Sequence, residues 1–466
     1  MPLFKCGLTT PSVKFILLFS KRFCCFSLLL LVSIIGVSNP HAQIAPIPAS
    51  GSYQIEADLG RIHFYLITVD VGDQVWDNFG HTALRVVDEA NNSDTVFNWG
   101  LFDASGGVVN FSYNFFKGVM NYRLGTTSPA REFAQYAGQE RTVWQDKLNL
   151  TNQQKEILYR RLLWNIEPRN VEYPYNYFFD NCTTRIRDYL NEALFGKIAN
   201  SNTGVTGYSF RDQVQSHYKS VGLVSISLDI LMNSNIDREV SEWEEMFLPL
   251  SLRTRLLGLS SDVAINGQRQ NLLTETEVVR AFPTPSAQTD PYRLAAMILL
   301  GPTLLLYLLL KKNSRPFFAT QFKIGFKIPG ISFRLLGALG LLTGLFSGIY
   351  GLLMLGSWFV SDHLDLHHNV NLLLFWPTDL FVIIVSLRWL FICKPWPMTI
   401  NHKPFIDYYL LAHVVGMVIY SLVWLLGYSA QLIDSIYYYV VPGFFLFTVL
   451  VWLVGFKAAR PKGVLY

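Results

Sequence analysis

Hydrophobic and polar positions follow two different patterns along the chain. Between residues 61 and 103, three stretches alternate apolar and polar residues, as strands with one buried face do, and polar turns separate them. Residues 132–167 and 180–195 instead repeat apolar positions at helical spacing, and Thr151 is placed to cap a helix. Residues 293–456 are mostly apolar runs broken by short polar loops. The pattern predicts an α+β domain followed by a bundle of membrane helices.

Five of the apolar runs are long enough to cross a hydrocarbon layer of about 30 Å. They are the runs 293–310, 333–358, 370–393, 405–427 and 436–456. Lysine and arginine follow the first, third and fifth runs, whereas the two remaining loops carry neither. Because positively charged loops stay in the cytoplasm, this charge pattern predicts that the last span ends inside. With five spans, the domain that precedes them then lies outside.

The first 42 residues have the pattern of a signal peptide. Lys21 and Arg22 precede an apolar run over 23–37, and a small residue, Ala42, stands before Gln43. An uncleaved anchor helix is the alternative. In either case the segment exports the chain that follows it, so the N-terminus and the loop charges independently predict a domain outside the cytoplasm.

Composition agrees with this division and argues against two classes of protein. Hydrophobic residues make up 51% and charged residues 15% of the 466 residues, which is too apolar for a wholly soluble protein. The net charge of +4, without a basic stripe that interleaves aromatics, gives no sign of nucleic-acid binding. We expect a signal peptide at 1–42, a periplasmic domain at 50–263, a polar tether at 264–290 and a five-helix membrane domain at 291–460.

Cys182 is the candidate nucleophile of the periplasmic domain. A cap by Asp180 or Asn181 would place it in the first turn of a helix, where free N–H groups favour a thiolate. It is also the only cysteine between the signal segment and the first span. Exported cysteines usually form disulfides, so a lone one is a candidate reactive thiol. A buried, inert cysteine is the alternative.

A thiol nucleophile needs a base, and three histidines lie in the periplasmic domain. His63 stands inside an apolar strand and His217 in a polar helical stretch, whereas His81 begins a strand directly after a glycine. We therefore expect His81 to act as the base for Cys182.

The base in turn needs a residue that orients it. Asn98, on the neighbouring strand of the same hairpin, is a polar residue in an apolar setting and could hydrogen-bond the imidazole. Asp103 and Asp77 are rivals for this role.

The order of these motifs resembles that of a group of thiol enzymes. The chain has a strand that begins with histidine, a next strand with a second polar residue, and an Asn-Cys pair at the start of a helix. This order is similar to that in the circularly permuted branch of the papain-like and NlpC-type enzymes, which includes lecithin:retinol acyltransferase. The Lnb family of lipoprotein N-acyltransferases, in which an exported domain precedes five membrane helices, is more similar still. The motifs that resemble it are FGHTALRV at 79–86, NWGLFD at 98–103, YPYNYFFDNCTTRIRD at 173–188 and WEEMFLP at 243–249.

The resemblance implies an activity. Cys182 would take an acyl chain from a membrane phospholipid as a thioester, with His81 as base and Asn98 as orienting residue. The chain would then pass to the α-amine of the diacylglyceryl-cysteine of an apolipoprotein. No cofactor or metal is implied, and the protein would lie in the bacterial inner membrane with its catalytic domain in the periplasm. An NlpC-type cell-wall peptidase or amidase, or another membrane thiol hydrolase, is the alternative reaction. A non-enzymatic receptor or assembly factor is the alternative class.

Three further residues of the cysteine motif are candidates for contact with the lipid substrate. Arg185 could bind a phosphate headgroup, or could instead pair with Asp180 or Asp188. Tyr177 belongs to an aromatic cluster that could line an acyl site or pack in the core. Asn181 stands directly beside the nucleophile.

The outward-facing loop after the second predicted span is rich in histidine. It holds His363, His367 and His368 together with Asp362 and Asp365. Such a cluster could bind a divalent metal. We favour the alternative, in which the loop contacts lipid headgroups or the catalytic domain.

Overall fold

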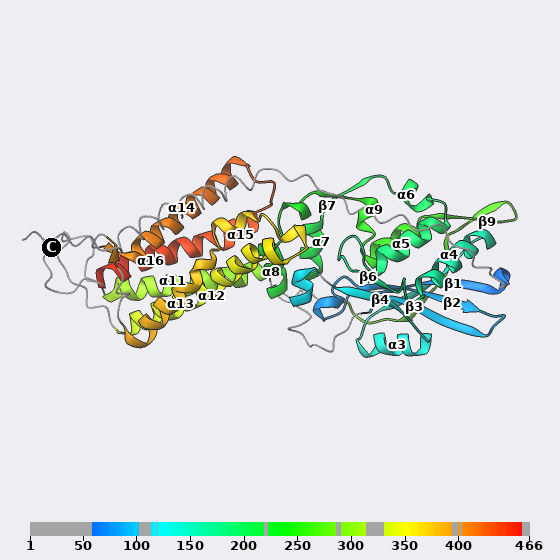
Figure 1. Ribbon diagram of the computed structural model, residues 1–466, viewed down its shortest axis with the longest axis horizontal. Helices are drawn as coiled ribbons and strands as arrows, with labels where there is room; N and C mark the ends of the chain where they lie inside the picture. The colour runs from blue at the N-terminus through cyan, green and yellow to red at the C-terminus, as the bar shows by residue number, and fades with distance from the viewer. Residues whose placement is uncertain are drawn as a thin grey trace, which may run out of the picture.

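The computed structural model describes residues 58–101, 113–118, 120–218, 222–285, 290–313, 330–393, 399–400 and 403–458. The predicted signal peptide at 1–42 and Asp103 lie outside these residues. Figure 1 shows an elongated molecule with a part built on a β-sheet at one end and a helical region at the other.

The first part is an α+β fold around an antiparallel sheet. Within the described residues seven strands pair in the order β11-β5-β1-β2-β3-β4-β6. Their bounds are β1 (Ile62–Val69), β2 (His81–Asp88), β3 (Ser93–Leu101), β4 (Asn121–Thr127), β5 (Val143–Leu148), β6 (Glu172–Pro174) and β11 (Leu273–Arg280). The three stretches predicted as strands between 61 and 103 form β1, β2 and β3, so this prediction is confirmed.

Helices cover both faces of the sheet (Figure 1). On one face, Leu158 of α4 (Asn152–Asn165) and Ile186 of α5 (Cys182–Ala193) join a large core with the sheet. On the other face, Tyr136 of α3 (Pro129–Gly138) packs on a smaller one. The remaining elements of this part are α6 (Lys197–Ser201), β7 (Val205–Ser209), α7 (Phe210–His217), α8 (Gly222–Leu231), β8 (Glu239–Ser241), α9 (Glu242–Glu245), α10 (Pro249–Leu257), β9 (Ser260–Ile265) and β10 (Gln268–Asn271).

The helical spacing predicted over 132–167 holds only at its two ends. Thr151 caps α4 in a capping box with Gln154, as expected. The middle of the stretch, however, forms strand β5, which pairs with β1 on one side and β11 on the other. The helical prediction is wrong there because pairing on both edges buries the strand, which overrides a weak local preference.

The predicted tether at 264–290 is also corrected. Residues 273–280 form β11, the edge strand of the sheet, and pair with β5. The polar composition that suggested a tether reflects an exposed edge strand, in which Glu275, Thr276, Glu277 and Val278 are all exposed. The sheet therefore extends well beyond the boundary expected at residue 263.

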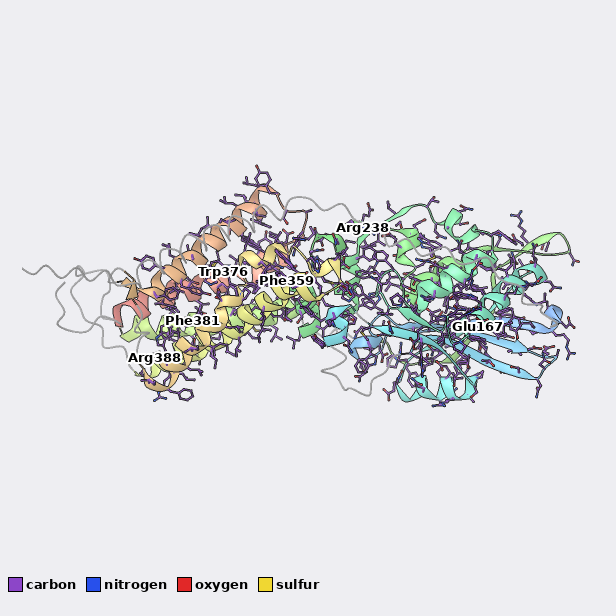
Figure 2. The ribbon with its side chains drawn as sticks, in the orientation of Figure 1. Glu167, Arg238, Phe359, Trp376, Phe381 and Arg388 are labelled. Atoms are coloured by element: carbon purple, nitrogen blue, oxygen red, sulfur yellow. The ribbon has the colours of Figure 1, made fainter. Side chains whose placement is uncertain are left out.

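The second part is a helical region. Its elements are α11 (Pro291–Asn313), α12 (Gly330–Val360), α13 (Leu380–Leu387), α14 (Phe405–Leu426), α15 (Asp434–Tyr439) and α16 (Val441–Ala458). A two-stranded ribbon, β12 (Thr399–Ile400) with β13 (Lys403–Pro404), precedes α14. Figure 2 places Phe359 near the junction with the sheet and Arg388 at the opposite end of the bundle.

Three helices among the described residues are long and apolar enough to cross a membrane, not five. They are Arg334–Val360, Tyr408–Leu426 and Asp434–Val451. A fourth span results if the bent pair Leu364–Leu373 and Pro377–Ile392 counts as one, although the two segments meet at 63°. The first predicted span, 293–310, falls within α11. Five spans therefore stay a prediction, of which the described residues support three or four.

Candidate active site

Cys182 begins helix α5, and its neighbour Asn181 caps the helix. The side-chain oxygen of Asn181 accepts hydrogen bonds from the backbone N–H groups of Thr183 and Thr184 at 2.9 and 2.8 Å. The hydroxyl of Thr184 accepts from the Asn181 N–H at 2.8 Å, which completes a capping box. The cap fixes the first turn, so the thiol lies at the positive end of the helix as predicted.

His81 begins strand β2 after a turn that requires glycine. Gly80 has φ +81°, and a Cβ there would lie 2.7 Å from the carbonyl oxygen of Val69. The next residue, Thr82, joins β2 to the start of α5, because its hydroxyl lies 3.0 Å from that of Thr183. This buried contact brings the first residue of the strand beside the first residue of the helix.

The Cys182 thiol and the His81 imidazole lie close enough for each to shift the pKa of the other. Burial alone would raise the pKa of the thiol, but the charge and hydrogen bond of His81, the backbone N–H of Thr82 and the Thr183 hydroxyl lower it to about 7. Burial likewise disfavours the imidazolium, yet the neighbouring Cys182 and the hydrogen bond to Asn98 raise the pKa of His81. The two groups therefore stabilise each other as a thiolate–imidazolium pair.

A chain of hydrogen bonds behind His81 fixes which imidazole nitrogen is basic. The Nε2 atom of His81 lies 2.8 Å from Oδ1 of Asn98, whose Nδ2 donates to Oε1 of Glu132 at 2.5 Å. The Tyr136 hydroxyl donates to the same carboxylate oxygen at 2.6 Å. A carboxylate only accepts, so Glu132 orients the Asn98 amide with its oxygen toward His81. Nε2 therefore carries the proton, and Nδ1 is the nitrogen that faces the thiol.

Glu132 is the residue of this site that sequence reasoning missed. It is buried, with 4% of its surface exposed, and it stands in the first turn of α3 on the far side of Asn98 from His81. Its spacing from Tyr136 puts the two side chains on one helix face. Nothing in the sequence places that face against Asn98, and so the local pattern contains no signal for the contact.

Gly100 forms the wall of the site on strand β3. Its φ is +92°, and a Cβ there would lie 3.8 Å from Cβ of Cys182 and 3.9 Å from both Cε1 of His81 and Cδ1 of Tyr122. The pairing of β3 with β4 shifts register between Asn98 and Leu101. This irregularity, together with the missing side chain, leaves room beside the thiol.

Arg185 forms an ion pair within the protein. Its guanidinium donates to both carboxylate oxygens of Asp180 at 2.7 and 2.8 Å and lies 3.8 Å from the centre of the Tyr173 ring. Of the two roles open to it from sequence, the structure shows the pair with Asp180. A phosphate headgroup would have to compete with that bidentate pair.

Asn181 and Tyr177, predicted to contact the substrate, both form hydrogen bonds within the protein. The Asn181 amide accepts two backbone hydrogen bonds and donates two more, to the carbonyls of Tyr177 and Phe247 at 2.9 and 3.1 Å, so its capacity is filled. Tyr177 is buried, and its hydroxyl donates to the carboxylate of Asp365, in the helical region, at 2.8 Å. Both side chains hold the protein together around Cys182.

The rival residues occupy other positions. Asp77 pairs with the buried Arg141 at 3.1 Å, and Asp103 lies outside the described residues. His63 lies 3.1 Å from Glu89, and His217 donates to the backbone carbonyl of its own helix.

The histidine-rich loop makes protein contacts. His363 and His367 donate to the carbonyls of Phe115 and Ser361, each at 2.9 Å. Among the described residues, no three His, Cys, Asp or Glu side chains group in a way that could hold a metal ion.

Comparison with known proteins identifies the region that contains the site. Residues 51–212 match the family model of the Lnb N-terminal periplasmic domain, a range that includes Cys182, His81, Asn98 and Glu132. No curated protein and no solved structure matches the chain. A region that matches the Lnb periplasmic domain, followed by three or four candidate spans, indicates a membrane protein.

Proposed function

We propose that this protein is a lipoprotein N-acyltransferase of the bacterial inner membrane that carries the acyl chain as a thioester on Cys182. The observation that carries the proposal is the Cys182–His81–Asn98 arrangement inside the region that matches the Lnb periplasmic domain. A histidine that begins one strand, an amide on the next strand and a cysteine that begins a helix also support a circularly permuted papain-like fold.

The first step transfers an acyl chain to the enzyme. The thiolate of Cys182 attacks the ester carbonyl carbon of a phospholipid, and the C–S bond forms as the ester C–O bond breaks. The imidazolium of His81 gives its Nδ1 proton to the departing glycerol oxygen, which leaves as a lysophospholipid. Asn98 keeps its oxygen on Nε2–H throughout, so the ring does not rotate away.

The second step transfers the acyl chain to the lipoprotein. The α-amine of a diacylglyceryl-cysteine attacks the thioester carbonyl, and the C–N bond forms as the C–S bond breaks. Neutral His81 takes the proton that the amine loses, and Cys182 leaves as a thiolate with a pKa of about 7. That low pKa makes the sulfur a good leaving group near neutral pH.

The oxyanion that forms in both steps needs a hydrogen-bond donor. The N–H groups of Thr183 and Thr184 already donate to Asn181. Within this turn we therefore assign the role to the N–H of Cys182 itself, supported by the helix dipole.

The helical region supports a lipid reaction over a cell-wall reaction. Both proposed substrates are lipids of one leaflet, and the part with the active site contacts the candidate spans through the loop at 361–369. A cell-wall hydrolase needs only an anchor, and no observation here favours that reaction.

Mass spectrometry of lipoprotein N-termini tests the proposal. Cells that lack their own N-acyltransferase would carry the intact protein, Cys182→Ala, His81→Ala or the matched control Cys393→Ala, whose cysteine lies beyond α13. We expect a third acyl chain on the amine with the intact protein and the control, and none with the other two. Lipoproteins that stay diacylated while the intact protein is present in the membrane would refute the proposal and make cell-wall peptides the next substrate to examine.

A further inference from the structure

The loop at residues 361–369, here called the outward loop, leaves the end of α12 and contacts the part that contains the active site. Its first three residues donate hydrogen bonds to the backbone carbonyls of one short segment, residues 115–117. The Ser361 hydroxyl donates to Phe116 at 2.5 Å, the Asp362 N–H to Lys117 at 2.8 Å and the His363 ring to Phe115 at 2.9 Å. The segment is thus held by three donors of the helical region.

A second contact of the outward loop lies five residues before the candidate nucleophile. Oδ2 of Asp365 accepts the hydrogen bond of the buried Tyr177 hydroxyl at 2.8 Å. Asp365 is itself held, because its carbonyl accepts from the Asn233 N–H at 2.7 Å. The Asn233 side chain also donates to the carbonyls of Leu364 and His367.

Hydrogen bonds connect this contact to the catalytic helix. The carbonyl of Tyr177 accepts from Nδ2 of Asn181 at 2.9 Å, and Oδ1 of Asn181 caps the turn that begins with Cys182. The hydrogen bonds that link Asp365 to this turn therefore pass through the side chains of Tyr177 and Asn181, which are both buried.

Ring packing forms a parallel connection. The ring of Phe115 lies 6.0 Å from that of Tyr177 and 5.8 Å from that of His363. Phe115 also packs against the same core as Cys182. The outward loop is therefore in contact with Tyr177 and, through Phe115, with the core against which Cys182 also packs.

We propose that Asp365 and His363 are positioning residues, which hold the Tyr177–Asn181 segment and Phe115 so that the Cys182 thiol stays against His81. The helical region then completes the active site and does more than anchor it. The acyl-transfer consequence rests on the proposed function, whereas the geometry of the thiol does not.

Small displacements explain why such a support matters. A Cys–His pair works only while its atoms stay in hydrogen-bond contact, and a shift of about 1 Å costs roughly 100-fold in rate. Tyr177→Phe keeps the ring and deletes one hydroxyl, so it would leave the Asp365 carboxylate without this donor. We expect acyl transfer by Tyr177→Phe and Asp365→Ala to fall by roughly 10- to 100-fold.

The pH dependence of Cys182 alkylation tests the proposal independently of any substrate. The full-length protein in detergent would be treated with iodoacetamide, and modification of the Cys182 peptide would be followed by mass spectrometry. The intact protein should react with a midpoint near its pKa of about 7, and the midpoint of both variants should move toward the ordinary value of 9.0. Asp365→Asn, which can still accept the hydrogen bond, should restore most of the shift.

Asp362→Ala is the matched control. Asp362 lies in the same loop with an exposed side chain, and only its backbone takes part in the contacts above. In Asp362→Ala, Cys182 should be alkylated with the same pH midpoint as in the intact protein. Should Asp365→Ala fail to fold, Tyr177→Phe decides the question, because its volume is nearly unchanged. Unchanged midpoints in folded Tyr177→Phe and Asp365→Ala would overturn the proposal. Shifted midpoints in a protein that transfers no acyl chain would support the positioning role and refute the proposed function.

Discussion

Replacing Glu132 by glutamine tests whether the orientation of Asn98 controls the base. In the structure the carboxylate accepts from Nδ2 of Asn98 at 2.5 Å, so the amide oxygen faces His81. Glutamine can also donate, which allows the Asn98 amide to turn over and present its NH₂ group to His81. The imidazole would then accept at Nε2 and carry its proton on Nδ1, where it cannot take a proton from Cys182.

The expected loss of rate follows from the loss of the negative charge of Glu132. A hydrogen bond to a charged group contributes about 1.5–3 kcal/mol and a neutral one about 0.5–1.5 kcal/mol, so the preferred orientation loses about 1–1.5 kcal/mol. That difference corresponds to roughly a 5- to 13-fold slower reaction. The measurement is the rate of acyl transfer to a synthetic diacylated lipopeptide, together with the pH midpoint of Cys182 alkylation, which should rise.

Tyr136→Phe is the control for this prediction. It removes the other hydrogen bond to Glu132 but keeps the charge and the contact with Asn98. We expect a smaller loss of rate and no rise in the alkylation midpoint. A Glu132→Gln variant within twofold of the intact protein, or a Tyr136→Phe variant as slow as Glu132→Gln, would refute the reasoning.

Three further predictions concern the thiol, its wall and the sheet. Cys182 alkylation should be half-maximal near pH 7 in the folded protein, where the pKa of the thiol is about 7, and near its ordinary pKa of 9.0 after denaturation in urea. Equal midpoints in the two states would contradict the pairing of Cys182 with His81. Gly100→Ala should destabilise the protein by about 1–3 kcal/mol and slow acyl transfer, since its φ is +92°, whereas Gly138→Ala, with open space around its Cβ, should do neither in the same assays. Asp146→Ala should lower the free energy of unfolding by about 3–5 kcal/mol, because it leaves Arg253 without its bidentate partner; a thermal melt unchanged from that of the intact protein would show the pair to be dispensable.

The sequence by itself determined the features that depend on near neighbours. Alternation placed β1, β2 and β3, Thr151 marked where α4 begins, and the pair Asp180 and Asn181 marked where α5 begins. Strand periodicity and caps act within a few residues, so a single sequence contains them. The hairpin of β2 and β3 also favoured Asn98 over its rivals, because its cross-strand partner Ala83 lies two residues from His81 and on the same face of the strand.

Only the tertiary structure decided which polar groups meet across long separations. Strand β5 exists because two strands pair with it, and the sheet gains β11 from a segment that reads as a tether. Glu132 meets Asn98 across 34 residues, and Tyr177 meets Asp365 across 188. The physical reason is that a buried polar side chain must find a partner wherever the packed chain supplies one, and packing is a property of the whole fold.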